Sequence, residues 1–200
     1  MMTTKVTILA KSSKHKGFCV AGVDENGRWV RLVSDEQGEA LAGSYCSNFD
    51  VLDVVSLLIE PKPIKYQPEN ILVKSKCSNV GKTNINDLLK KHPYLLHNGD
   101  YIFANNTHKV FEEDMGLLKN SLLIAKVKDI STVFLDGRKC KASFVYNGRN
   151  YINVSVTDPN CYTKDPISYK GAYIVVSVPS EPWETYGYFK FVAAIYPITN

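Results

Sequence analysis

The chain has 200 residues, a formal net charge of +4 and a hydrophobic content of 44%, so it can bury one sizeable core or two smaller ones. Twelve tyrosines, eight phenylalanines and two tryptophans favour strands over helices. The net charge is lower than that of a dedicated nucleic-acid module, so any polyanion must be bound by local charge. The sequence shows neither a signal peptide nor an apolar run near the roughly 20 residues of a membrane span. These features predict a cytoplasmic protein without a membrane partner.

The five cysteines are too far apart to form a zinc-ligand motif, and they are also odd in number. We therefore expect no metal site and no cofactor, with the thiols reduced and buried as small hydrophobes. The segment Gly81–Lys82–Thr83 resembles the end of a P-loop, but Lys76 stands where that loop requires its first glycine. The sequence therefore predicts no hydrolysis of ATP or GTP by this segment.

Two Asn-Gly turns mark two predicted β-hairpins, centred on Asp24–Gly27 and on Tyr146–Arg149. One helix is expected over residues 84–92, with Asn84 or Asn86 as its N-cap and Pro93 as its stop. Many short strands separated by turn residues indicate an all-β fold with a minor helical component. The further strands are predicted at residues 5–10, 49–60, 66–73, 121–135, 173–178 and 188–196.

The two hairpins also share a local pattern, because Asn26–Asp35 resembles Asn147–Asp158. Each segment runs from Asn-Gly-Arg through an aromatic residue and alternating β-branched residues to Ser or Thr before Asp. A repeat of this kind predicts two β-subdomains of related build. We place them at residues 1–110 and 111–200, either separate or intertwined into one unit.

A basic, hydroxyl-rich loop precedes the first hairpin, and an Arg- and Trp-containing strand follows its turn. The strand's alternation places Trp29 and Arg31 on one face, with Arg28, Val30 and Leu32 on the other. A cationic loop beside an Arg/Trp face suits a ligand with phosphates and a stackable ring. The loop residues that we select as candidates are Lys11, Ser12, Lys14 and His15.

Each of these candidates has a structural alternative. The loop lysines equally fit a solvated surface, and a core position is the favoured reading of Trp29. Arg31 would then point inward and need an anionic partner, either an internal carboxylate such as Asp158 or a ligand phosphate. The Asp158–Pro159 segment with Tyr162 fits a structural turn or an acceptor for ligand.

The opening sequence, KVTILAKSSKHKGFCVAGVDENGRWVRLVSD, resembles the start of the dual OB-fold domain proteins, a family of uncharacterised prokaryotic proteins. Their pattern of "lakS-K-gg-CvAG" followed by "G-WvRpvs" is matched except at Leu32, where the family tends to carry proline. The "-vtDp-y" segment at Val156–Tyr162, the apolar strand at Ala172–Ser177 and the closing strand at Phe189–Ala194 extend the resemblance to the C-terminal part. The resemblance implies two OB-like barrels, no established reaction and an inferred role in binding nucleic acid or nucleotides.

We therefore predict an all-β protein of two OB-like barrels that binds single-stranded nucleic acid or a phosphorylated nucleotide near the N-terminal hairpin. An enzyme acting on a nucleotide or modified base, with His15 and Asp158 as acid and base, is one alternative. The absence of a nucleophile elbow, a paired-carboxylate signature or HExxH favours a non-enzymatic role, and no catalytic residue is assigned. A protein-interaction module of a prokaryotic defence system is another alternative. The predicted ligand-binding residues are Lys11, Ser12, Lys14, His15, Arg28, Trp29, Arg31, Asp158 and Tyr162.

Overall fold

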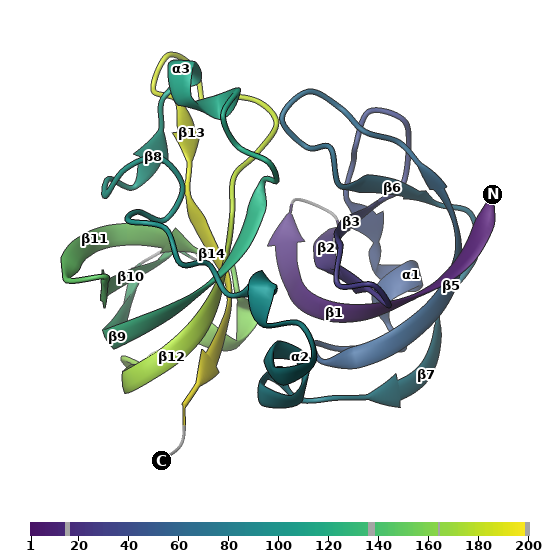
Figure 1. Cartoon of the computed structure of the whole chain (residues 1–200), viewed down its shortest axis with the longest axis horizontal. Coiled ribbons are helices and arrows are strands. Elements are labelled where there is room, and N and C mark those ends of the chain that lie inside the picture. The colour runs from purple at the N-terminus through teal and green to yellow at the C-terminus, as the bar shows by residue number, and fades with distance from the viewer. Residues whose placement is uncertain (15–16, 136–138, 164, 199–200) are drawn as a thin grey trace. The chain divides into compact units, whose positions relative to one another are not determined.

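The computed structural model describes residues 1–14, 17–135, 139–163 and 165–198 (Figure 1). The chain divides into two compact units, Met1–Leu95 and Leu96–Asn200. Strands are the main element of both units, and the helices are short. The prediction of an all-β fold with a minor helical component is confirmed.

In the first unit, five strands close into a barrel. The long strand β1 (Met2–Lys14) pairs with both β2 (Gly17–Asp24) and β5 (Asp53–Pro61). One edge of β1 pairs with β5 over residues 2–7 and the other with β2 over residues 6–14, and a bulge between Ile8 and Ala10 bends the strand. The ring is completed by β3 (Trp29–Val33), which runs parallel to β6 (Asn70–Val73), and by the pairing of β6 with β5. The other elements are β4 (Leu41–Ala42), α1 (Gly43–Cys46), β7 (Ser78–Lys82), α2 (Ile85–Lys91) and the 3-10 turn η1 (Pro93–Leu95).

The second unit repeats this strand order. Its closed barrel runs β10-β11-β14-β12-β9, with β11 parallel to β14. The five strands are β9 (Leu122–Leu135), β10 (Lys139–Tyr146), β11 (Arg149–Val156), β12 (Ser168–Ser177) and β14 (Phe191–Pro197). The β2–β3 and β10–β11 turns occupy the same place in the two barrels, so the predicted equivalence of the two Asn-Gly hairpins is confirmed. The connecting elements are β8 (Lys109–Val110), α3 (Glu112–Met115), η2 (Pro159–Cys161) and β13 (Tyr188–Phe189).

Each barrel has its own apolar core, built from alternate residues of its strands. Val20, Val30 and Leu32 are among the core residues of the first barrel, and Ala142, Tyr151 and Val154 among those of the second. All five cysteines are free, and four of them are buried. Burial raises the pKa of the Cys161 thiol to about 12, so this group stays protonated and acts as a small hydrophobe.

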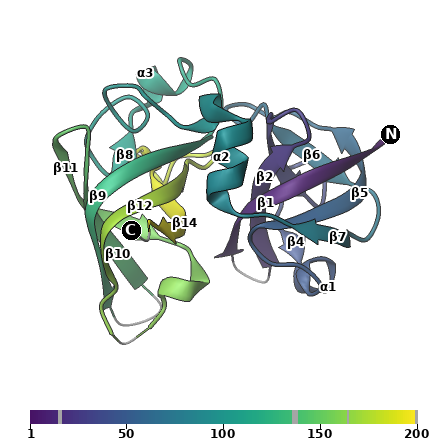
Figure 2. The ribbon, with the colours of Figure 1, turned by 60° about the horizontal axis from the view of Figure 1, so that its bottom comes forward.

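The predicted helix is confirmed as α2, with Asn84 as the N-cap that accepts a hydrogen bond from the Asp87 amide. The structure also contains a strand, β7, that the sequence pattern does not predict. All five residues of β7 are exposed, so they carry no apolar alternation, and the chain passes from β7 directly into α2 (Figure 2). The predicted strand at residues 49–60 begins only at Asp53. No helix among the described residues is both long and apolar enough to span a membrane.

Candidate nucleic-acid interface

The two connections next to the predicted N-terminal site lie at opposite ends of β2, although Lys11 and Ser12 themselves belong to the strand β1. The basic loop joins β1 to β2, whereas the turn that leads to Arg28 joins β2 to β3. Because β2 has eight residues, these two loops are roughly 23 Å apart at about 3.3 Å per residue. Lys11 and Arg31 nevertheless both border the middle of β2, because Lys11 pairs with Val20 and Arg31 with Ala21. A ligand shared by these residues stays a prediction.

Lys11 belongs to the interior of the first barrel. Its ammonium donates hydrogen bonds to the Cys46 and Phe49 carbonyl oxygens, both at 2.8 Å. The rings of Phe18 and Phe49 lie 5.3 and 5.4 Å from the same nitrogen. These contacts give Lys11 a structural role in holding the end of α1 against β1.

Arg28 is held by the turn that it follows. Its guanidinium contacts the Asp24 carboxylate at 2.7 Å, and the same carboxylate accepts the backbone N–H groups of Asn26 and Arg28 at 2.9 Å. Burial alone would raise the pKa of Asp24, but the hydrogen bonds from Arg28 and Asn26 and the Arg28 charge outweigh it and lower that pKa. Asp24 therefore stays ionised and fixes the hairpin.

Arg31 is buried beside a carboxylate of its own barrel, but on the face of β3 opposite the core residues Val30 and Leu32. The predicted core position of Trp29, with Arg31 pointing inward beside it, is therefore wrong. Its Nε is 3.6 Å from Glu69 Oε1, and both side chains are almost fully buried. The Arg31 amide also donates to the Glu69 carbonyl at 2.9 Å. The internal carboxylate is thus Glu69, and Asp158 is not needed for this role. Trp29, at the start of β3, is half-buried.

Asp158 and Tyr162 flank η2 in the second unit. Asp158 accepts hydrogen bonds from the Asn160 and Ile195 amides at 3.0 and 3.1 Å, so it caps the 3-10 turn and ties it to β14. The Tyr162 hydroxyl donates to the Val156 carbonyl at 3.4 Å, and burial raises its pKa. In the first unit, Ser12 is buried, while His15 and the Lys14 side chain lie outside the described residues.

A different set of side chains gathers on the second barrel. Val133, Lys141 and Ser155 stand side by side across β9, β10 and β11, which are the first three strands of this barrel. Lys141 Nζ donates to Ser155 Oγ at 2.8 Å, so a serine on the next strand orients its ammonium. Val133 is 53% exposed, an unusual position for an apolar side chain unless it packs against something else.

A short ribbon, formed by β8 and β13, brings an imidazole and an aromatic ring to the same barrel. Phe189 pairs with Lys109, and the exposed His108 ring stacks on the Phe189 ring with 5.5 Å between centroids and 17° between planes. Burial lowers the pKa of His108, and the charges of Lys109, Lys141 and Lys190 lower it further. The strand pairing places Lys141 next to this ribbon, because Ser155, which holds Lys141, pairs with Phe191, two residues after Phe189. We call His108, Lys109, Lys141, Ser155 and Phe189 the basic–aromatic surface.

Two lysines of the basic–aromatic surface have no ion-pair partner among the described residues. Within the described part of the chain, neither Lys109 nor Lys141 has a carboxylate within ion-pair distance; Lys109 instead lies 5.3 Å from the Phe111 ring centre. The exposed Lys139 lies two residues before Lys141 on β10. An ammonium without a carboxylate partner is available to a phosphate.

Lys190 is a buried residue that holds the β8–β13 ribbon by hydrogen bonds to Asn105 and His108. It follows β13 directly and is only 1% exposed. Its ammonium donates to the Asn105 carbonyl at 2.6 Å and to Asn105 Oδ1 at 3.0 Å, and the Lys190 amide donates to the His108 carbonyl at 2.9 Å. Burial lowers its pKa to about 7. Lys190 thus fixes the backbone that carries His108 while adding a titratable positive charge beneath it.

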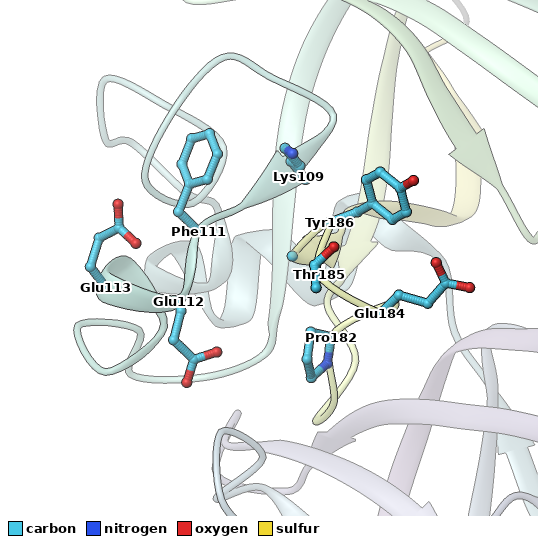
Figure 3. A pocket seen from close by; sticks show the side chains of 9 residues that line it. Lys109, Phe111, Glu112, Glu113, Pro182, Glu184, Thr185 and Tyr186 are labelled. Carbon is cyan, nitrogen blue, oxygen red and sulfur yellow. The ribbon is translucent and has the colours of Figure 1, made fainter.

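Lys109 also lines a cavity of about 360 Å³ between residues 111–113 and the loop that joins β12 to β13. Figure 3 shows Phe111, Glu112 and Glu113 on one wall and Glu184, Thr185 and Tyr186 on the other. Three carboxylates against one ammonium make this cavity unfavourable for a phosphate. We therefore place an anionic ligand on the basic–aromatic surface and not in the cavity.

The sequence assigns no ligand role to His108, Lys109, Lys141, Ser155 or Phe189. No local pattern marks Lys141, because alternating lysines are ordinary on a solvated strand. Of the aromatic residues near the β13 strand, Trp183 and Tyr186 are exposed, whereas Tyr188 is buried and bonds to Glu112.

Two five-stranded closed barrels, each with its third strand parallel to its last, define a protein built of two OB folds. The chain belongs to the Dual OB-containing domain family, whose model matches residues 4–195. The resemblance found at both ends of the sequence is thereby confirmed. A solved structure described as the tetrameric p202 HIN2 is similar at a TM-score of 0.35 and 10% sequence identity, over 99% of this chain and 92% of that chain. No curated protein matches the chain.

Proposed function

We propose that the protein binds single-stranded nucleic acid on the basic–aromatic surface of its second barrel. The observation that carries the proposal is the arrangement around Lys141, an ammonium oriented by Ser155, free of a carboxylate partner among the described residues, and close to a stacked His108–Phe189 pair. OB folds bind oligonucleotides on the face of their second and third strands and on the loops beside it. Lys141 and Ser155 lie on those two strands, and Phe189 lies in the connection between the fourth and fifth.

The chemistry suits a single strand for two reasons. Lysine ammonium groups neutralise successive phosphates, and aromatic rings stack on bases that a duplex would keep paired. The exposed apolar side chains of Val133, Leu135 and Ile152 on the neighbouring strands add contact area that does not depend on base identity. This combination supports binding with little sequence preference.

The N-terminal residues support a structural role better than a ligand role. Lys11, Arg28 and Arg31 each contact carbonyl or carboxylate oxygens of the first barrel. Binding at Lys14 and His15 stays a prediction. We therefore propose the second barrel as the principal site, and a mononucleotide as the weaker alternative ligand.

The test is fluorescence anisotropy of a labelled single strand of about 15 nucleotides across a salt series, using the full chain. We expect affinity to fall steeply with salt, because each neutralised phosphate releases counterions. Lys141→Gln should weaken binding about tenfold and lower the salt slope by about 0.7.

Lys170→Gln is the matched control, because Lys170 is a lysine of the same barrel that is 98% exposed and lies near Asp129 on another strand pair. It should leave the affinity within twofold of the unmodified protein. Equal losses in the two variants would mean that only net charge matters, and would contradict a defined site. A shallow salt slope with binding to mononucleotides would favour the alternative ligand.

A further inference from the structure

His108 occupies an unusual position for an exposed histidine. One face of its ring is covered by Phe189, and three lysines contribute positive charge to it: Lys109 from β8, Lys141 from β10 and Lys190 from the segment after β13. Burial and these charges all disfavour the imidazolium, so the pKa of His108 lies below its ordinary value. In the free protein near neutral pH, the ring is neutral.

A bound phosphate reverses this balance. An anion beside Lys141 cancels the repulsion from the lysines and offers an acceptor for the second ring N–H of the imidazolium. The charged form is then favoured, so the pKa of His108 rises on binding. Thermodynamic linkage requires that a group whose pKa rises on binding takes up a proton.

We propose that His108 is the proton acceptor of nucleic-acid binding: occupation of the basic–aromatic surface by a phosphate converts its neutral imidazole to an imidazolium that contacts that phosphate. This inference rests on the proposed function and adds a regulator to it. The affinity for a single strand then rises as the pH falls through the bound-state pKa of His108. It levels off once the pH is below the free-state pKa, because the ring is then charged in both states.

Lys190 is the other titratable group beneath the ribbon, and Asp114 is the carboxylate that partly offsets its burial. Its ammonium is directed to the two oxygens of Asn105 and is buried, so it cannot contact a phosphate directly. His108 is exposed and can. The geometry therefore assigns the phosphate-contacting proton to His108.

Isothermal titration calorimetry tests this with a single-stranded oligonucleotide at about pH 7, in buffers of different ionisation enthalpy. The dependence of the observed heat on the buffer gives the number of protons taken up. We expect net proton uptake when the unmodified protein binds the strand. His108→Gln should bind more weakly and, at oligonucleotide concentrations that saturate it, should lose most of that uptake.

His97→Gln is the control, because His97 lies in the same unit but is stacked on Tyr146, with its Nε2 2.7 Å from the Tyr101 carbonyl oxygen. It should keep the proton uptake. Strand binding without proton uptake would overturn the inference and leave the proposed function standing, as would an uptake unchanged in His108→Gln. Absence of strand binding at every pH from about 6 to about 8.5 would instead overturn the proposed function itself.

Discussion

The outer faces of the second and third strands differ sharply between the two barrels. On β2, the positions that point away from the core include Ala21 and Val23, which are 3% and 0% exposed. On β10, the equivalent face carries Lys139, Lys141 and Ser143, all at least partly exposed. One strand order thus supports a largely buried outer face in the first barrel, where Arg31 pairs with Ala21, and a solvated basic face in the second. The fold specifies where a ligand can bind, and the surface side chains decide which barrel binds it.

The two equivalent hairpins also differ in their side chains, although their backbones occupy the same place in the barrels. Each Asn-Gly turn is followed by an arginine, but Arg28 pairs with Asp24, whereas Arg149 lies over the Tyr101 ring at 4.4 Å. The difference follows from the residues before the Asn-Gly pair, since a carboxylate, Asp24, lies two residues before Asn26, whereas Val145 lies two residues before Asn147. A carboxylate there confines the arginine to its own turn.

The largest effect should come from the buried ion pair of the first barrel. Glu69→Gln removes the carboxylate that lies beside the Arg31 guanidinium. Removing one member of a buried ion pair lowers the free energy of unfolding by about 3–5 kcal/mol. We expect urea denaturation to show that loss in the free energy of unfolding. The folded variant should bind a single strand as before. A loss of strand affinity at low denaturant, with stability unchanged, would mean that Arg31 serves a ligand.

The two turn glycines should differ in their tolerance of alanine. Both have positive φ, 72° at Gly27 and 73° at Gly148, so alanine costs about 1–2 kcal/mol at either site. A Cβ at Gly27 would also lie 2.2 Å from the Tyr94 hydroxyl and 2.7 Å from His92 Nδ1, whereas at Gly148 nothing lies within 4 Å. We expect Gly27→Ala to destabilise by about 1–3 kcal/mol more in thermal or urea unfolding. Equal losses would contradict the packed environment of the first turn.

The next largest effect should be the loss of single-strand affinity when the aromatic ring of Phe189 is removed. Phe189→Ala removes a ring on which a base can stack, and such contacts contribute about 1–3 kcal/mol per base. Anisotropy should show a loss of about 5- to 150-fold in single-strand affinity. Tyr45→Ala, at an exposed aromatic of the first barrel, is the control and should change the affinity less than twofold. The reverse ranking would place the ligand on the first barrel.

The smallest effect concerns the pH dependence of stability. Of the two Asn-Gly hairpins, we expect only the first, which contains Asp24, to lose stability in acid. Because the folded-state pKa of Asp24 is lowered, its ionised form contributes stability above the unfolded-state pKa. That contribution is lost as the pH falls through the folded-state value. Asp24→Asn should therefore reduce the free energy of unfolding at about pH 7, and the difference from the unmodified protein should shrink toward about pH 2.5. A difference independent of pH would show that the carboxylate charge is unimportant.

Much of the fold could be predicted from local sequence, because its main signals are local. The Asn-Gly turns, the β-branched strands and the Asn84 cap each act within a few residues. The echo between Asn26–Asp35 and Asn147–Asp158 reflects the shared position of β3 and β11. By contrast, β7 has no apolar alternation, and only its pairing with β5 makes it a strand.

The candidate site was harder to predict because long-range pairing builds it. His108 and Phe189 meet through the β8–β13 ribbon, and Lys141 and Ser155 meet across a register that shifts at a bulge between Ala142 and Phe144. None of these neighbours is visible in the local sequence. The N-terminal cluster is conspicuous for the opposite reason, because its charges are close in sequence. In the structure, Lys11, Arg28 and Arg31 contact groups of their own barrel.

The central claim is that the second barrel binds single-stranded nucleic acid. The most direct test is to map the bound oligonucleotide by changes in the NMR chemical shifts of the backbone amides of the full chain. Titration with a single-stranded oligonucleotide should perturb His108, Lys109, Lys141, Ser155 and Phe189 most strongly, and leave Arg28, Trp29 and Arg31 near their free positions. The largest perturbations at Lys11, Arg28, Trp29 and Arg31 would place the strand on the first barrel and contradict the account.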